Sequence, residues 1–328
     1  MSMRWYVARR VAWAVLATYL ILSITFGLLA VSPGNGQTAF AFSAATSGGD
    51  VEEAQETFKK ITGRDKPVLE RYQDYMVNMA TLNWGWSFTR NQPVMDAIAE
   101  AYPYSLMYFL PATVISLILG YGIGLYSATH QYTKTDYFGT FVAFFGISIP
   151  NFWFGIMLIL IFGVTLGWLP TFFQTQAILD HGVFSVANAK QLVMPVVVLS
   201  TAAMAANMRY SRAEALEYVH AEFVKTARAK GASDWRVLLR HIFRPALVPL
   251  MTILIGDILA VLFAGAYITE VVFQIPGLGQ LSYKAIIQQD TPLVLATTLI
   301  PVFLVIIGNL LQDIAYTVLD PRIDYEGR

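Results

Sequence analysis

The stretch VAWAVLATYLILSITFGLLAV, residues 11–31, contains no charged side chain. A helix needs roughly 20 mainly apolar residues to cross a hydrocarbon core about 30 Å thick, so this stretch is long enough for one crossing. Further apolar stretches of this kind lie at 104–128, 137–165, 192–208, 247–269 and 292–316. The sequence therefore predicts an all-α membrane protein with six transmembrane helices.

The positions of the charged residues support these boundaries. All 22 Lys and Arg residues fall outside the six stretches, and of the 22 Asp and Glu residues only Asp257 and Asp313 fall inside. Charged residues make up 13% of the chain, about half the usual share in a soluble domain. The formal net charge of zero gives no indication of a nucleic-acid partner.

Some of the stretches have irregular features. The stretch 192–208 is short and contains Pro195, and 137–165 contains Pro150-Asn151, which predicts a kink or break. The first stretch follows Arg9 and Arg10, as the apolar region of a secretory signal peptide does. Signal regions have only roughly 7–15 apolar residues, so we interpret 11–31 as a retained helix.

Basic residues in the short loops predict the orientation. The N-terminus and the loop 209–246 are rich in Arg and Lys, whereas the loops 166–191 and 270–291 contain only Lys190 and Lys284. Because Lys and Arg are enriched in cytoplasmic loops, both termini and the loop 209–246 are predicted to be cytoplasmic. The segment 32–103 is then extracytoplasmic, with helices expected at about 50–60 and about 67–80.

The loop 209–246 has the pattern of two short amphipathic helices. Apolar residues recur at three- and four-residue steps in its first half (Leu216, Val219, Phe223 and Ala227) and in its second half (Trp235, Leu238, Leu239 and Ile242). Each set predicts one apolar helix face. Gly231 suits the left-handed residue that ends a helix, Ser233 suits the N-cap of the next, and Pro245 predicts a break or kink before the following span. These helices either lie on anionic lipid or dock into a groove on a partner, and the pattern alone leaves both readings open.

The same loop resembles a known family. Its segments EFVKTARAKG (222–231) and HIFRPALVP (241–249) resemble the cytoplasmic signature loop of binding-protein-dependent ABC permeases of the dipeptide/oligopeptide/nickel family. FAGAYITE (263–270) with PGLG (276–279), and NLLQD (309–313) with DPRI (320–323), are similar to further family motifs, as are Ala8-Arg9-Arg10 and Pro33-Gly34. Departures are Lys225 and Thr226 in place of the general Glu-Ala, Asp257 in place of a neutral residue, and Asn35 in place of an acid.

The resemblance implies an ABC type I importer-like permease fold. It divides the chain into 1–31 (cytoplasmic N-terminus and first transmembrane helix), 32–103 (extracytoplasmic cap segment) and 104–328 (five-helix permease core with the coupling loop 209–246). The coupling helix would sit in a cleft of a cytoplasmic ATPase, and the residues that the resemblance assigns to this ATPase-coupling loop are Glu222, Thr226, Ala227, Arg228, Lys230, Gly231, Asp234 and Trp235. Small Ala227 and Gly231 would allow close approach, and Arg228, Lys230 and Asp234 would make polar contacts.

The resemblance also implies the partners. They are a second, similar permease subunit, two cytoplasmic ATPase subunits, an extracytoplasmic solute-binding protein and the lipid bilayer of the plasma membrane, with no nucleic acid. The chain would translocate di- or oligopeptides, or a related small solute, without doing chemistry of its own. No GxxxxGK[ST] phosphate-binding string occurs, so the chain is expected to hold no cofactor, and ATP and Mg would be bound by the separate ATPases.

Single residues within the spans have competing interpretations. A carboxylate in hydrocarbon is costly, so Asp257 lies on the substrate pathway, pairs with a polar group at a packed interface or faces a water-filled cavity. Asp313 is interpreted as structural, capping a helix or pairing with a basic loop residue. Gly120 and Gly124 have the spacing of close helix packing. The turn 276–279 is expected to be a tight turn that re-enters the membrane.

Two alternative functions have sequence requirements of their own. An autonomous secondary transporter or channel would need coupling acids or duplicated broken helices, and neither pattern is evident. An intramembrane enzyme would need a nucleophile and base or metal ligands inside the spans. The chain has no cysteine, its 4 histidines lie outside the spans, and no metal site is predicted.

Overall fold

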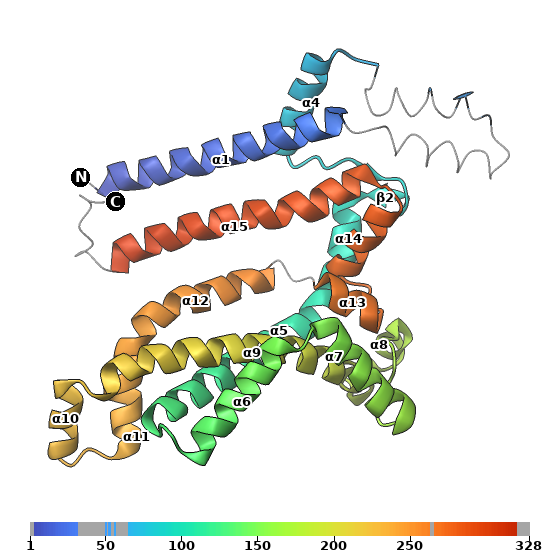
Figure 1. Ribbon diagram of the computed structural model, residues 1–328. Coiled ribbons are helices and arrows are strands. Elements are labelled where there is room, and N and C mark those ends of the chain that lie inside the picture. Colours follow the sequence, from blue (N-terminus) through green and yellow to red (C-terminus); the bar gives the residue numbers. More distant parts are fainter. Residues whose placement is uncertain are drawn as a thin grey trace. The chain divides into compact units, whose positions relative to one another are not determined.

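The computed structural model describes residues 3–31, 65–262 and 266–319, together with positions 50, 52, 53 and 56. It is built almost entirely of helices (Figure 1). Within the described residues, four helices are long and apolar enough to cross a membrane, and up to six spans result if each of two bent helix pairs counts as one. Pro33-Gly34, the motif 320–323 and most of the expected helix at about 50–60 lie outside the described residues.

Four predicted spans correspond to single long helices. They are α1 (Met3–Val31), α5 (Val94–Thr129), α9 (Val186–Val219) and α15 (Thr291–Leu319). The short stretch 192–208 is thus only the apolar middle of a helix of 34 residues. The predicted length was too small because α9 continues past the apolar core with a polar end, which hydropathy does not register.

The third predicted span is broken, as Pro150-Asn151 predicts. Helix α6 (Lys134–Ser148) and helix α7 (Asn151–Leu158), which continues into a wider π-helical stretch (Ile159–Thr165), meet at an angle of 102°. Pro150 has an extended ψ of 129° directly before α7, so it ends one helix and starts the next.

The fifth predicted span begins earlier than expected. Helix α11 (Asp234–Arg236) runs through a π-helical stretch (Val237–Phe243) into α12 (Arg244–Leu262). The axis bends by 60° between Asp234–Leu247 and Pro249–Ile258. The bend therefore lies next to Pro249, and the break that Pro245 predicts is displaced by about one helical turn.

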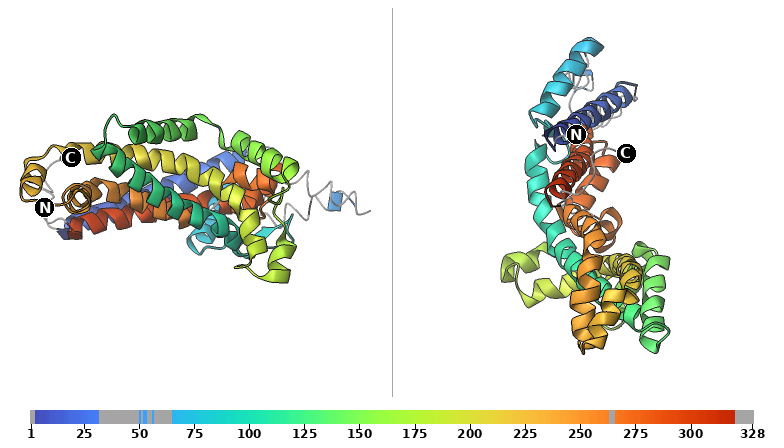
Figure 2. Two further views of the ribbon diagram at one scale, coloured as in Figure 1. Left: turned by 90° about the horizontal axis from the view of Figure 1, so that it is seen from below. Right: turned by 90° about the vertical axis from the view of Figure 1, so that its left-hand side faces the viewer.

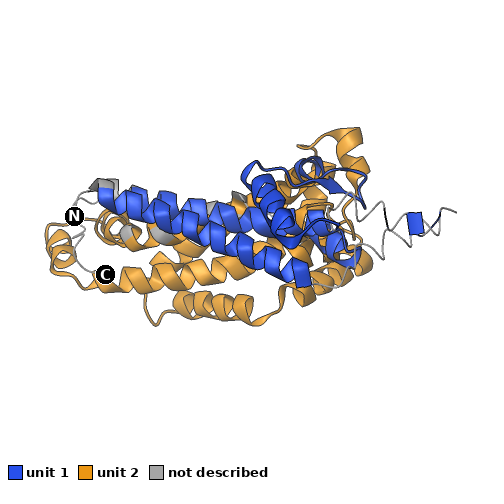
Figure 3. Ribbon diagram, turned by 90° about the horizontal axis from the view of Figure 1, so that it is seen from above, with its two compact units in different colours: residues 1–100, 281–328 blue, residues 101–280 orange. Residues whose placement is uncertain are grey.

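The chain packs as two compact units: residues 1–100 with 281–328, and residues 101–280 (Figure 3). The boundaries fall inside α5 and inside α14 (Leu278–Ile287), so packing divides the chain differently from the sequence-based division at 31 and 103. That division follows the expected membrane crossings, and it stays a prediction.

In the first unit, α1 and α15 run antiparallel, side by side (Figure 1). The Arg10 guanidinium of α1 lies 3.0 Å from the Asp313 carboxylate of α15. This ion pair confirms the structural interpretation of Asp313. It also joins the beginning of the first span to the end of the last one.

At the opposite end of α1, helix α4 (Val68–Ala80) packs against it and confirms the helix predicted at about 67–80. The ring of Phe26 contacts Tyr72 edge-on at 5.2 Å, and the Tyr72 hydroxyl lies 2.7 Å from that of Ser23. The antiparallel strands β1 (Trp86–Ser87) and β2 (Gln92–Pro93) follow α4. The buried Asp290 carboxylate before α15 accepts hydrogen bonds from the side chains of Ser87 (2.6 Å) and Thr89 (2.7 Å) and so holds the hairpin.

In the second unit, α5 and α6 both pack along α9 (Figure 2). A Cβ on Gly120 would lie 2.7 Å from the Cβ of Asn207, and one on Gly124 would collide with Ser211. These glycines therefore let α5 approach α9 closely, which confirms the packing role predicted for them. The aromatic side chains of the third span mostly face outward, among them Phe141, Phe144 and Trp153.

Candidate functional site

The loop predicted to dock on a partner forms a sharp corner at the end of α9 (Figure 1). Helix α9 ends at Val219, α10 (Glu222–Ala229) follows, and α11 begins at Asp234. We call residues 222–235 the 222–235 corner. Gly231 has φ +79° at the turn between α10 and α11, which confirms the left-handed glycine predicted there.

The prediction that the first half of this loop forms one continuous helix is wrong. Leu216 and Val219 belong to α9, Phe223 and Ala227 belong to α10, and the chain turns at His220 and Ala221 between them. Two short helices that pack on one apolar cluster produce the same three- and four-residue spacing as a single helix face. Periodicity alone therefore cannot distinguish the two arrangements.

Apolar packing fixes the corner to the rest of its unit. One buried cluster joins α5, α9, α10 and the π-helical stretch before α12; it consists of Leu125, Ala128, Ala215, Val219, Val224, Val237, Leu238 and Ile242. Val224 and Ile242 are completely buried. The sequence identified Leu238 and Ile242 correctly but missed Val224 and Val237.

The outer side of the corner carries exposed charged and aromatic side chains. Glu222, Thr226, Arg228, Lys230, Gly231 and Asp234 are exposed, and Trp235 has 68% of its surface accessible. The Glu222 carboxylate pairs with the Lys225 ammonium at 2.7 Å on this surface. Seven of the eight predicted coupling residues are therefore exposed, and Trp235 is the large apolar side chain among them.

The predicted residues of the corner differ in burial. Ala227 is only 8% exposed, and its role in close approach by a partner stays a prediction. In the predicted second apolar face, Trp235 and Leu239 are exposed, whereas Leu238 and Ile242 are buried. Ser233 occupies the N-cap position of α11, but its side chain makes no capping hydrogen bond.

An ion pair with a buried carboxylate and a partly buried guanidinium joins α9 to α6, and the sequence did not indicate it. The Arg212 side chain of α9 donates from Nε to Asp136 Oδ1 and from Nη2 to Asp136 Oδ2, each at 3.2 Å. Arg212 Nε also donates to the Ser127 hydroxyl of α5 at 3.1 Å, and that hydroxyl in turn donates to Asp136. Asp136 is only 3% exposed and lies in the first turn of α6. We call Ser127, Asp136 and Arg212 the Asp136–Arg212 clamp.

A second buried carboxylate explains the motif FAGAYITE…PGLG. Glu270, in α13 (Tyr267–Phe273), is completely buried. Its Oε1 accepts from the hydroxyls of Ser105 (2.7 Å) and Tyr108 (2.8 Å), both in α5, and its Oε2 accepts from the Gln280 amide (2.8 Å). The Ser105 hydroxyl also accepts from the Leu278 amide at 2.8 Å, so the turn is held to α5 from two directions.

The glycines of PGLG are required for space at this carboxylate. A Cβ on Gly277 would lie 2.6 Å from Glu270 Oε2, and one on Gly279 would lie 2.7 Å from the Tyr267 amide nitrogen. The chain turns between α13 and α14, as predicted, but only Pro276 and Gly277 of the segment 276–279 lie before α14, which begins at Leu278. We call Glu270 with residues 276–280 the Glu270 turn. Its re-entry into the membrane stays a prediction.

Asp257 of α12 has a polar partner in the structure. The Asn207 side-chain amide of α9 donates to Asp257 Oδ2 at 3.1 Å, and Asn207 is only 3% exposed. This contact supports the interpretation that Asp257 pairs at a packed interface. Its role on a substrate pathway stays a prediction.

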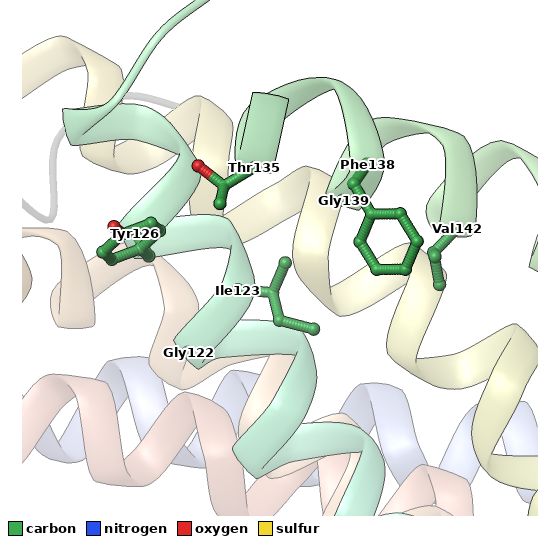
Figure 4. Close-up of a pocket in the computed structure, with 7 residues that line it drawn as sticks. All are labelled: Gly122, Ile123, Tyr126, Thr135, Phe138, Gly139 and Val142. Carbon is green, nitrogen blue, oxygen red and sulfur yellow. The ribbon is translucent and has the colours of Figure 1, made fainter. Parts of the chain in front are cut away.

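A hollow of about 340 Å³ lies between α5 and α6 (Figure 4). Its lining consists of Gly122, Ile123, Tyr126, Thr135, Phe138, Gly139 and Val142. Small-molecule sites combine an apolar lining with a few convergent polar groups, and this lining lacks such convergence. Among the residues that the structure describes, no group of three or more His, Asp or Glu side chains is placed to hold a metal ion.

Residues 120–325 match the family described as binding-protein-dependent transport system inner membrane component. The chain is 35% identical to the oligopeptide transport system permease protein AppB of Bacillus subtilis, over 98% of this chain and 99% of the relative. It is 33% identical to the dipeptide transport system permease protein DppB of Lactococcus lactis, over 97% and 98%. It is 30% identical to the oligopeptide transport system permease protein OppB of Haemophilus influenzae, over 98% and 99%.

The match extends over the 222–235 corner, the Asp136–Arg212 clamp and the Glu270 turn, and the relatives align along nearly the whole chain. A multi-pass membrane protein with several long apolar helices agrees with both findings. The chain therefore belongs to the binding-protein-dependent transport system inner membrane component family and is an ABC transporter permease.

Proposed function

We propose that this permease imports di- or oligopeptides that an extracytoplasmic binding protein delivers, and that the 222–235 corner is its coupling helix on a cytoplasmic ATPase. The names of the relatives, which are oligopeptide and dipeptide transport system permeases, support the substrate class. The proposal includes two ATPase subunits that bind ATP and Mg, a second permease subunit and no enzymatic activity in this chain.

The observation that carries the coupling role is the two-sided character of the corner. Val224 is completely buried, whereas Trp235 is 68% exposed. Burial fixes α10 to the ends of α5 and α9, and an exposed Trp in a segment that also carries exposed charges resembles the aromatic anchors that fill pockets on partner proteins. A helix pair that only rested on anionic lipid would not require charges of both signs, such as Glu222 and Asp234 beside Arg228.

The proposed topology has six spans with both termini in the cytoplasm. The ion pair between Arg10 and Asp313 supports termini on the same side of the bilayer, because it joins the start of α1 to the end of α15. The high content of Lys and Arg in the loop 209–246 supports the cytoplasmic side.

The test is a pull-down of the tagged chain from gently solubilised membranes, with wild type compared to Gly231→Trp. At Gly231 an added Cβ meets nothing within 4 Å, so we expect a Trp side chain there to project from the corner and block docking. The matched control is Gly182→Trp, because Gly182 also has a positive φ (+83°) and open space, but lies in the loop 166–191.

We expect an ATPase and a second permease to copurify with wild type and with Gly182→Trp. Gly231→Trp is expected to lose the ATPase alone while it stays inserted and bound to the second permease. If both Trp variants retain the ATPase equally, the corner is not the docking element. If wild type brings down no ATPase in several mild detergents, the autonomous transporter or channel becomes the better explanation.

A further inference from the structure

We propose that the Asp136–Arg212 clamp transmits the movement of the coupling helix to α6, so that both residues are positioning residues for transport. This inference rests on the proposed function of the 222–235 corner. It concerns residues outside the 222–235 corner that no sequence motif marked.

The geometry of the clamp makes it a joint between three helices. Arg212 bridges the last turn of α5 through Ser127 and the first turn of α6 through Asp136. The Tyr132 amide donates to the second carboxylate oxygen of Asp136 at 2.9 Å, so the loop between α5 and α6 is bound to the same group. Bidentate Arg–carboxylate pairs fix orientation as well as distance, which apolar contacts do not.

The clamp lies close to the coupling helix along the chain. Arg212 is one helical turn before Ala215, which is buried in the apolar cluster that also holds Val219 and Val224. The end of α9 and α10 are thus packed as one body. Arg212 belongs to that body, whereas Asp136 belongs to α6.

Through Asp136, the clamp is connected to the broken third span. Helix α6 joins α7 across the 102° bend, and Gly155 of α7 packs against Phe273 of α13, where an added Cβ would lie 3.2 Å from the ring. A displacement of α10 that reaches Asp136 would therefore act on the bent helix pair instead of being absorbed at the α9–α6 contact.

The Asp136 carboxylate differs from other buried carboxylates in the kind of partner that it binds. Within the described part of the chain, the buried Glu270 and Asp290 accept hydrogen bonds from hydroxyls and backbone amides, whereas Asp136 also faces a guanidinium. Removing one partner of such a pair leaves an uncompensated charge, but removing both charges leaves a neutral contact. A double variant can therefore separate the loss of the joint from the loss of folding.

The experiment uses the copurified transporter with its binding protein, reconstituted in liposomes and supplied with a radiolabelled mixture of di- and oligopeptides. It compares wild type, Arg212→Lys, the double variant Asp136→Asn/Arg212→Gln, and the control Arg90→Gln/Glu100→Gln. The control removes an exposed ion pair of 3.4 Å in the 32–103 segment. The readout is peptide taken up per ATP hydrolysed.

A second readout follows the joint itself. The chain contains no cysteine, so labels placed at the exposed positions Tyr137→Cys on α6 and Glu217→Cys on α9 have no background. The distance between the two labels is measured with and without ATP. A purely structural role of the clamp would not make this distance depend on ATP.

We expect the double variant to assemble and hydrolyse ATP, with peptide uptake per ATP reduced about fivefold or more, in the range of typical coupling between sites. The distance between the labels should be independent of ATP in wild type and should change with ATP in the double variant. Arg212→Lys, which keeps the charge but not the bidentate geometry, should give an intermediate uptake ratio and assemble normally.

If both the double variant and Arg212→Lys take up as much peptide per ATP as wild type, the proposed role of the clamp is wrong, but the proposed function stands. The same conclusion would follow from label distances that are independent of ATP in every variant while wild type still transports. If wild type itself shows no ATP-dependent uptake, the proposed function fails, and the role of the clamp fails with it.

Discussion

The 222–235 corner and the Glu270 turn are both glycine-containing corners between short helices, but they are stabilised in opposite ways. At the first corner apolar side chains such as Val224 are buried and the charges face outward. At the second a carboxylate is buried and the hydrogen-bond donors converge on it. The glycines differ as well: Gly231 is needed for a positive φ with open space around it, whereas Gly277 is needed because there is no space.

This comparison separates a surface made for contact from a joint made for rigidity. A corner fixed by apolar packing leaves its polar groups free to meet a partner. A corner fixed by a buried carboxylate uses its polar groups internally, and each unpaired donor there would be costly. Substitutions at Glu270, Gly277 and Gly231 test this contrast.

The largest effect is expected from Glu270→Ala. The change removes the acceptor for Ser105, Tyr108 and the Gln280 amide, and leaving several buried donors unsatisfied costs on the order of 4 kcal/mol. The loss of stability is measured as the thermal unfolding midpoint of the detergent-solubilised protein, with size-exclusion chromatography as the readout of the folded fraction. Glu270→Gln keeps one acceptor oxygen and should recover part of the stability. An unfolding midpoint for Glu270→Ala equal to wild type would show that the carboxylate does not hold the turn.

A smaller loss is expected for Gly277→Ala. The added methyl group would overlap with the Ser105 hydroxyl and the Glu270 carboxylate, and such overpacking costs about 1–3 kcal/mol. The same thermal assay applies, with Gly122→Ala as the control because an added Cβ there meets nothing within 4 Å. Equal midpoints for the two variants would contradict the close approach at Gly277.

The smallest effect is expected for Gly231→Ala. An added Cβ finds open space, so the cost is only that of the left-handed conformation, about 1 kcal/mol. Gly182→Ala, with φ +83°, carries the same backbone cost in a different loop and should shift the midpoint by a similar amount. A loss for Gly231→Ala as large as that for Gly277→Ala would mean that the corner is packed against something and is not an open surface.

Local sequence patterns predicted much of the fold. The apolar stretches predicted six candidate spans, Pro150 predicted the break in the third, and Gly231 predicted the left-handed turn. Patterns failed where two elements share one cluster, as with Val219 and Phe223, which lie in separate helices. They also underestimated α9, because its polar end carries no hydropathy signal.

The candidate site was only partly predictable for the same reason. The charged and aromatic residues of the corner could be named because they are consecutive and resemble a family motif. Val224 and Val237 could not be identified as its buried anchors, because their burial depends on Leu125 and Ala128 of α5, far away in the sequence.

The membrane class, the helical architecture, the glycine at the corner and the motifs that resemble the family can all be read from the amino-acid sequence, since each depends on composition or on neighbours a few residues apart. Which side chains contact one another is known only from the folded chain. The Glu270 carboxylate contacts Ser105 at a separation of 165 residues, and Arg212 contacts Asp136 at a separation of 76. A buried charge needs a partner in space, and no local pattern specifies which distant residue that partner is.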